Sequence, residues 1–465
     1  MAPATQCYRL AILCAELATE AAVEPRLDSV AAREAVRTRA EQHAFAAHLV
    51  SLVLGAGMIL WIDRHMWFLW DEWNFFNYIH PAFERGDWVT FLFQPYFGHW
   101  IAVPNLLWEA AFRIGGLRNY VVYLIPMLVA HVGAVALVRI ALRRAGVGPW
   151  AATALALLVL LPGPGAANLA FGWQIEFVGA VFFGLAQLLL SDHDGPVDWR
   201  DGAGLLFGVL GMMCSTAFLA MIVAIGGNLV LRRRWLAAAV GVLPLVAVLA
   251  AWYVAIGHSL PTTAGLQPNF PIPSPSAARI AQLPGFVWKG VSSTLDGLTG
   301  LAGISGALVA ITLGLAARFS FVPPKKGASL AYSMALAGVA FFFITGYGRI
   351  QNGVSYASEG RYLYVGATLF LPLIGAVVAR VAADRRFVPA VAVLFCWAAL
   401  TNVTGLYLGL HEQVTKGQNL RQTVEQLAAD PRLDSMSPSQ PVQVEGALFL
   451  NVGLVRELRD QHELP

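Results

Sequence analysis

Charged side chains are scarce in this sequence: Asp, Glu, Lys and Arg make up 13% of its 465 residues, against about 25% in a typical soluble protein. Hydrophobic residues make up 57%, and the mean hydropathy is +0.61. So few charges cannot cover the surface of a 50 kDa globule, which excludes an ordinary soluble enzyme and a disordered chain. The net charge of only +3 excludes a basic nucleic-acid-binding protein. The class that remains is a multi-span membrane protein.

Cysteine is also rare, with four residues that lie far apart or in apolar runs: Cys7, Cys14, Cys214 and Cys396. Their spacing excludes a CxxC pair, a zinc motif and a secreted disulfide framework. We expect them to be small hydrophobic residues. The sequence likewise has no Walker A motif, no dinucleotide-binding glycine pattern after a strand, no Gly-x-Ser-x-Gly elbow and no His-Glu-x-x-His.

Long apolar runs are abundant, and a membrane span needs roughly 20 such residues. Eight runs qualify as transmembrane helices: 44–62, 120–141, 170–190, 235–255, 297–317, 328–346, 360–380 and 388–409. A shorter run, 149–161, ends at Pro162-Gly163-Pro164-Gly165, and the apolar stretch 203–231 is interrupted by Cys214-Ser215-Thr216. The sequence therefore predicts an all-α polytopic membrane protein.

Positive charge in short loops predicts the cytoplasmic side of a membrane protein. The basic loops contain Arg143 and Arg144, Arg232 to Arg234, Arg318 with Lys325 and Lys326, and Arg380 with Arg385 and Arg386. For these loops to share one side, 203–231 must cross the membrane twice, as two short helices that meet near Cys214. The acidic loop 191–202 fits this side less well. The result is about eleven helices, with the N-terminus inside and the C-terminus outside.

Three parts of the chain follow from this topology. Residues 1–43, which mix five Arg with six acidic residues, predict a cytoplasmic extension, and residues 44–409 predict the transmembrane domain. Its outward loops include 63–119, which we expect to carry interfacial helices, and the Pro-rich 256–296. Residues 410–465 are polar and predict a small extracytoplasmic tail.

Two adjacent carboxylates, Asp71 and Glu72, lie within the aromatic run Trp67–Phe76 of the first outward loop. A carboxylate at an apolar boundary is costly to bury unless it is hydrogen-bonded, paired or metal-bound. Either both side chains point into water, or they supply a general base or a metal ligand. His99 follows later in the same loop, and it is either structural or, with a reference pKa of about 6.5, suited to binding phosphate.

Further polar residues mark the outer ends of later spans. Gln174 and Glu176 begin one span, where they either form helix–helix hydrogen bonds or face a functional site. Arg349 follows the span 328–346, and Arg361 with its neighbour Tyr362 opens the span 360–380. Because Arg binds phosphate bidentately and stays protonated, both arginines are candidates to hold an anion. The alternative for Arg361 is an ion pair with Glu359.

An acidic pair after the first span, a His/Pro segment and an interfacial helix resemble the GT-C glycosyltransferase superfamily, particularly its uncharacterised bacterial branch. An Asn-x(5)-Gln stretch ending at Gln174 and the late Arg361-Tyr362 add to the resemblance. It covers most of residues 44–409 in topology and implies a GT-C-like helix bundle. The segment Trp100-Ile101-Ala102-Val103-Pro104 departs from the Pro-rich run of protein O-mannosyltransferases, which argues against protein mannosylation.

The resemblance implies a hexosyl- or pentosyltransferase that moves a sugar from a polyprenyl-phosphate donor to a glycan or lipid acceptor, with inversion. It implies that Asp71 is the general base and that Glu72 is its partner, or that both hold a divalent cation, Mg²⁺ or Mn²⁺. Arg361 and Arg349 would stabilise the departing phosphate, and His99 would bind donor or acceptor. A bacterial plasma membrane is the expected location, with the active site on the extracytoplasmic face.

Two other functions fit the same features. A transporter or flippase of lipid-linked saccharides would also use aromatic residues and Arg, but it predicts internal repeats or paired broken helices, which we do not find in the sequence. A non-catalytic membrane scaffold predicts that changing the acidic pair has no effect.

Overall fold

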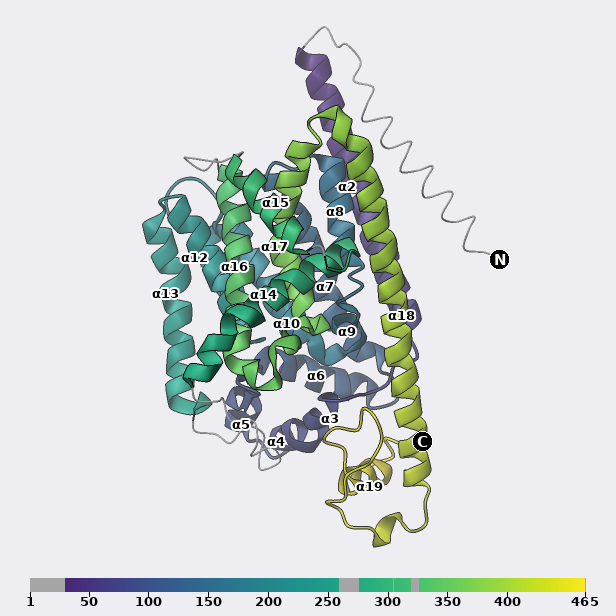
Figure 1. Ribbon diagram of the computed structural model, residues 1–465. Helices are drawn as coiled ribbons and strands as arrows, with labels where there is room; N and C mark the ends of the chain where they lie inside the picture. The colour runs from purple at the N-terminus through teal and green to yellow at the C-terminus, as the bar shows by residue number, and fades with distance from the viewer. Residues whose placement is uncertain (1–29, 259–275, 304, 319–325, 465) are drawn as a thin grey trace, which may run out of the picture.

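The computed structural model describes residues 30–258, 276–303, 305–318 and 326–464. Cys7, Cys14 and the first 29 residues of the predicted extension lie outside this part. The described chain is a bundle of helices (Figure 1). Its longer helices are α2 (Val30–Asp63), α6 (Ala102–Gly115), α7 (Val121–Arg144), α8 (Pro149–Leu160), α10 (Ile175–Ser191), α11 (Trp199–Met212), α12 (Phe218–Leu231), α13 (Trp235–Trp252), α14 (Ala277–Thr299), α15 (Ser305–Arg318), α16 (Lys326–Arg349), α17 (Gly360–Val381) and α18 (Val388–Ala428).

Short elements connect these helices and gather largely at the lower end of the bundle in Figure 1. Between α2 and α7 these are α3 (Glu72–Asn74), the π-helical turn η1 (Phe75–Ile79), α4 (His80–Glu84), α5 (Trp88–Phe93), β1 (Pro95–Tyr96) and β2 (His99–Trp100). Later ones are α9 (Ala166–Ala170), η2 (Gly172–Gln174), η3 (Tyr253–Gly257), η4 (Ile350–Asn352), η5 (Val354–Ser358), η6 (Arg385–Phe387), η7 (Leu433–Ser435) and α19 (Val452–Asp460). The predicted interfacial helices correspond to α3 through α6.

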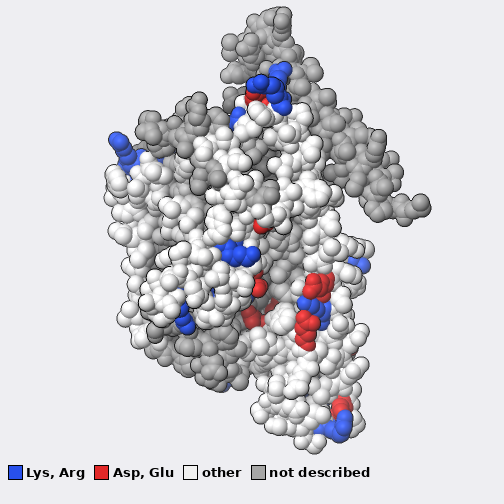
Figure 2. Space-filling view, in the orientation of Figure 1, with Lys and Arg blue, Asp and Glu red and all other residues white. Residues whose placement is uncertain are grey.

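Seven of the described helices are long and apolar enough to cross a membrane, which confirms a polytopic all-α protein. The predicted number of eleven is not confirmed. Helices α11, α12 and α15 have 14 residues each, and 14 residues span only about 21 Å, less than the roughly 30 Å hydrocarbon core. In Figure 2 the visible face is mostly uncharged, as a lipid-facing surface should be.

The prediction that 203–231 forms two short helices is confirmed: α11 ends at Met212, and α12 begins at Phe218. The predicted helix 297–317 is wrong, because α14 continues to Thr299 and α15 begins only at Ser305. Helix α14 lies in the stretch predicted as an outward loop. Its buried residues recur every three or four positions, but Pro284 and the polar residues between them conceal this pattern: Leu283, Phe286, Gly290, Thr294, Leu298.

Helix α18 is 41 residues long and runs well past the predicted boundary at 409 (right edge of Figure 1). Its buried face continues with spacings of three or four residues: Leu406, Leu410, Val414, Gly417, Leu420, Val424 and Ala428. Asn402 anchors it, donating through Nδ2 to the carbonyls of Gly297 and Leu298 and accepting at Oδ1 from the Gly163 amide. The last turns of α18 therefore reach the lower end of the bundle.

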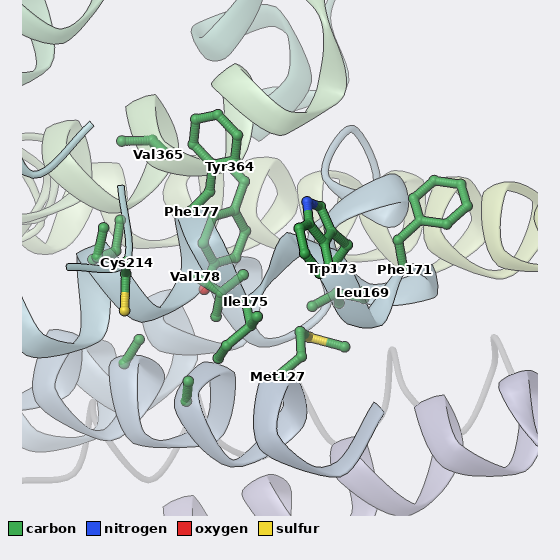
Figure 3. Packing of buried hydrophobic residues seen from close by; sticks show 14 of the residues in the cluster. Met127, Leu169, Phe171, Trp173, Ile175, Phe177, Val178, Cys214, Tyr364 and Val365 are labelled. Carbon is green, nitrogen blue, oxygen red and sulfur yellow. The ribbon is translucent and has the colours of Figure 1, made fainter. Parts of the chain in front are cut away.

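The largest hydrophobic core joins nearly all of these elements. Figure 3 shows Trp173 and Phe177, from the chain around η2 and α10, with Met127 of α7 and Tyr364 of α17. Below the bundle, aromatic rings of the first loop pack edge to face; Phe68 alone contacts six of them: Trp67, Trp73, Phe76, Trp108, Tyr120 and Tyr123. This packing gives the first outward loop, which carries Asp71 and Glu72, a rigid base.

Candidate active site

A pocket of about 490 Å³ opens at the lower end of the bundle. Its walls come from the first loop, the β1–β2 hairpin, the start of α10, the chain between α16 and α17, α18 and the C-terminal tail. All eight residues that the sequence singled out line it: Asp71, Glu72, His99, Gln174, Glu176, Arg349, Arg361 and Tyr362. These residues span nearly 300 positions of sequence, and the fold gathers them. In Figure 2, acidic atoms are visible deep in a hollow of this face.

Glu72 holds the first outward loop together. Its Oε2 accepts from the Leu69 amide at 2.9 Å, and its Oε1 accepts from the Tyr120 hydroxyl at 2.5 Å and the Trp173 amide at 3.4 Å. Tyr120 in turn accepts from the Gly172 amide at 3.0 Å. Burial raises the pKa of Glu72 to about 8, although these hydrogen bonds act in the opposite direction. Glu72 thus ties the first loop to the starts of α7 and α10.

Asp71 is less constrained. Its side chain makes no capping hydrogen bond to α3, although it occupies the N-cap position. Burial raises the pKa of Asp71, while Arg361 and then Arg349 lower it. A carboxylate with a raised pKa, facing a pocket, is a stronger base than one in water.

His99 sits beside a tight hairpin turn, in which Phe97 and Gly98 adopt φ of +47° and +84°. Its Nδ1 lies 3.0 Å from Ser215 Oγ and 2.6 Å from Thr216 Oγ1. The polar break between α11 and α12 therefore serves to hold His99. Burial, and then Arg349 and Arg361, lower the pKa of His99 to about 3, so the ring is neutral, contrary to the near-neutral titration expected from sequence.

The two arginines approach the pocket from consecutive helices. Arg349 ends α16 and donates to the Phe97 carbonyl at 3.1 Å. Arg361, in the first turn of α17, donates to the Tyr356 hydroxyl at 2.5 Å, and its guanidinium lies 5.4 Å from the centre of the Tyr362 ring. No Arg361–Glu359 ion pair occurs among the described residues. The turn after α8 packs directly against the start of α17, since a Cβ on Gly360 would lie 2.3 Å from the Pro164 carbonyl oxygen.

Several buried polar atoms at the pocket have no hydrogen-bond partner within the described chain. They are Tyr96 Oη, Trp173 Nε1, Gln174 Oε1, Glu176 Oε2, Arg361 Nε and Gln413 Oε1. Glu176, only 4% exposed, also interacts electrostatically with Asp71 and both arginines. Buried polar groups are normally satisfied, so this concentration indicates a site built to receive a polar ligand.

Sequence reasoning missed part of the pocket wall. Gln413 and Lys416 come from the part of α18 beyond residue 409, and Leu448 comes from the tail. Lys416 pairs with Glu412 at 2.8 Å and with Glu445 at 3.0 Å. The regular apolar spacing that continues to Ala428 was the available indication that α18 extends this far. Nothing local in the sequence indicates that Leu448 reaches the pocket.

The described residues contain two groups of three side chains that could hold a metal ion: His80, Glu84, Glu109 and His193, Asp198, Asp201. Neither contains Asp71 or Glu72. Carboxylates of both groups already form ion pairs with arginine: Arg113 pairs with Glu109 and Glu84, and Arg200 pairs with Asp198.

No family model and no curated protein sequence matches the chain. Its fold matches that of ArnT from Cupriavidus metallidurans bound to undecaprenyl phosphate, with a TM-score of 0.52 and 15% identity over 88% of this chain and 84% of ArnT. The apo structure of ArnT gives 0.53 and 15% over 89% and 85%. ArnT is a GT-C glycosyltransferase. The predicted GT-C resemblance is therefore confirmed at the level of the fold.

Proposed function

We propose that this protein is a membrane glycosyltransferase that transfers a sugar from a polyprenyl-phosphate donor to a glycan or lipid acceptor, with inversion. The observation that carries the proposal is the convergence of Asp71, Glu176, Arg349 and Arg361 on one pocket, with polar atoms left for a ligand. The GT-C-type fold supports it, and so does the undecaprenyl phosphate bound to the structurally similar ArnT.

In the proposed reaction, an acceptor hydroxyl attacks the anomeric carbon of the donor. The Asp71 carboxylate accepts the hydroxyl proton as the new C–O bond forms. The bond between the anomeric carbon and the phosphate oxygen breaks at the same time, and the electron pair leaves with the polyprenyl phosphate. A single displacement of this kind inverts the anomeric centre.

Arg349 and Arg361 are the groups proposed to stabilise the departing phosphate, since both are permanently charged and can donate bidentately. Where the Nδ1 of a neutral His99 accepts from the hydroxyl of Ser215 or Thr216, the ring proton lies on Nε2, which can then donate to a sugar hydroxyl or a phosphate oxygen. Gln174, Glu176 and Tyr362 would orient the sugar. Glu72, whose two oxygens already accept hydrogen bonds, is proposed to hold the loop rather than a divalent cation.

The location of the pocket favours an enzyme over a transporter. Its lining comes from elements at one end of the bundle rather than from the middle of the spans, where transporters bind their substrates. We propose that this end faces the extracytoplasmic side of a bacterial plasma membrane. The Arg-rich turns after α7 and α12 lie together with the α10–α11 turn, away from the pocket elements, as Arg144–Asp192 and Arg232–Asp192 ion pairs link them.

The test is transfer of radiolabelled sugar from a panel of polyprenyl-phosphate donors in membranes, with wild-type protein and Asp71→Asn. We expect transfer by the wild type only, and equal donor binding by both proteins. Asp192→Asn, at the opposite end of the bundle, is the matched carboxylate control and should transfer sugar as the wild type does. Wild-type binding without transfer would contradict the enzyme and favour a carrier of lipid-linked saccharides.

A further inference from the structure

A loop near the C-terminus packs against the first outward loop, which carries Asp71 and Glu72. This C-terminal loop, residues 441–452, is closed by hydrogen bonds from the Val442 amide to the Leu450 carbonyl and from the Val452 amide to the Gln440 carbonyl. It reaches the first loop through the Gly446 carbonyl, which accepts from the Trp70 amide at 2.7 Å. Trp70 is the residue immediately before Asp71. Segments about 375 positions apart in the sequence therefore meet at the base of the site.

The backbone at this contact is strained. Among the described residues, five other than glycine have a positive φ, and three of them meet here: Trp70 at +52°, Phe97 at +47° and Phe449 at +67°. A non-glycine residue in this region costs of order 1–3 kcal/mol and persists only where its surroundings hold it. Trp70 precedes Asp71, and Phe97 forms the hairpin turn before His99, so the strain lies next to both proposed site residues.

The C-terminal loop contains one of these strained residues, Phe449, and contacts the other two, Trp70 and Phe97. Besides the Gly446 hydrogen bond to Trp70, the Phe449 carbonyl accepts from Asn77 Nδ2. The rings of Phe449 and Phe97 have centroids 6.3 Å apart. Leu448 itself lines the pocket, and Glu445 binds Lys416 of α18 at 3.0 Å. These contacts fix the loop to the pocket wall on two sides.

Close approach at Gly446 requires glycine. Its φ is +89°, and a Cβ there would lie 2.2 Å from Leu69 Cδ2. Leu69 donates its backbone amide to Glu72, so a displacement of the Leu69 backbone would move the acidic pair.

We propose that the C-terminal loop is a positioning element of the active site, which holds Trp70 and Phe97 in their strained conformations and thereby aims Asp71 and His99 into the pocket. This inference rests on the proposed glycosyltransferase function. It predicts that loosening the C-terminal loop lowers the rate of transfer more than the affinity for the donor. The reason is that Arg361, proposed to hold the donor phosphate, belongs to α17 and donates to Tyr356, outside these contacts.

The test compares Gly446→Ala with Gly195→Ala in the full-length protein. Gly195 is a matched control, because it has a similar φ of +95° but nothing within 4 Å of a Cβ. Hydrogen–deuterium exchange of peptides covering residues 66–76 should accelerate in Gly446→Ala only. With the donor that the wild type uses, kcat should fall at least about tenfold, and KM for the donor should stay within about twofold.

A second variant, Phe449→Gly, guards against misfolding of Gly446→Ala, because glycine suits the positive φ of Phe449. It should accelerate exchange across residues 94–100 and also lower kcat. If hydrogen–deuterium exchange in Gly446→Ala and Phe449→Gly equals that in Gly195→Ala, the proposal is overturned, whether or not the wild type transfers sugar. Faster exchange with unchanged kcat overturns it as well. Absence of transfer by the wild type refutes the proposed function instead, and exchange then decides whether the C-terminal loop holds the site.

Discussion

The two ends of the helix bundle contain similar charged residues but arrange them differently. At one end, Asp192 accepts from Arg144, Arg232 and Asn228, and His193 lies 2.9 Å from Asp201. At the other end, Asp71 makes no capping bond, and Glu176 Oε2 has no partner within the described chain. Buried carboxylates occur at both ends, and the difference is that Asp192 and Asp201 each have an Arg or His partner within hydrogen-bonding distance, whereas Glu176 Oε2 has none within the described chain.

The paired end, where Asp192 binds Arg144 and Arg232, explains an inconsistency in the sequence. The acidic loop 191–202 fits the side that carries the arginines poorly when charge is counted loop by loop. Its acids instead neutralise the arginines of neighbouring turns: Arg232 binds Asp194 at 2.6 Å, and Arg234 lies 3.6 Å from Asp201. Satisfied pairs of this kind fix helix ends, whereas unsatisfied ones are kept where a ligand completes them.

Replacing Asp71 should produce the largest effect on function. Asp71→Asn removes the proposed base, so transfer should fall about 10²–10⁴-fold. The unfolding temperature in detergent should not fall, because no hydrogen bond that holds the loop is lost. Radiolabel transfer together with thermal unfolding checks both. A variant that transfers at the wild-type rate would remove Asp71 from the mechanism.

The same replacement at the paired end should have the opposite signature. Asp192→Asn leaves Arg144 and Arg232 without their shared anion, and it should lower the free energy of unfolding by about 2–3 kcal/mol. The kcat for transfer should stay at the wild-type value, because Asp192 does not line the pocket. Chemical unfolding and transfer assays on one preparation provide the measurement. Loss of activity without loss of stability would contradict the contrast between the two ends.

Arg361 offers a subtler test of the pocket end. Arg361→Lys keeps the charge but loses bidentate donation, so transfer should fall about tenfold.

Transfer requires unprotonated Asp71, so its rate should rise with pH through the pKa of Asp71. Since Arg361 lowers the pKa of Asp71, Arg361→Gln should move this acidic limb to higher pH, while Arg361→Lys should leave it nearly unchanged. A pH–rate profile that is identical in all three proteins would argue against contact between Arg361 and the base.

His99 should give the smallest effect, and it appears in stability. Its pKa is lowered from 6.5 to about 3 in the folded protein, so the unfolded chain binds more protons between these values. Stability is therefore full above pH 6.5 and is lost as the pH falls, by about 1 kcal/mol at pH 5.5. Thermal unfolding at pH 7.5 and 5.5 should show this loss in the wild type and a smaller one in His99→Gln. An equal loss in both would mean that His99 is not held neutral.

Physical patterns of the sequence determined the class of protein and predicted most of the candidate site. Scarce charge and long apolar runs predicted a polytopic all-α membrane protein, because such a surface is stable only in lipid. Charge placement predicted that 203–231 divides into two helices, as α11 and α12 confirm. Ionisable residues at the ends of spans are costly, which is why Asp71, Glu176 and Arg361 could be singled out before the fold was known.

Tertiary structure alone decided how these residues work together. Glu72 looks equivalent to Asp71 in the sequence, yet only the fold brings Tyr120 and Trp173 to its carboxylate. The same holds for His99, whose partners Ser215 and Thr216 lie more than 110 positions away, and for Gly446 beneath Trp70. Such contacts depend on how distant helices pack, and no local pattern of hydrophobicity or charge encodes a partner so far along the chain.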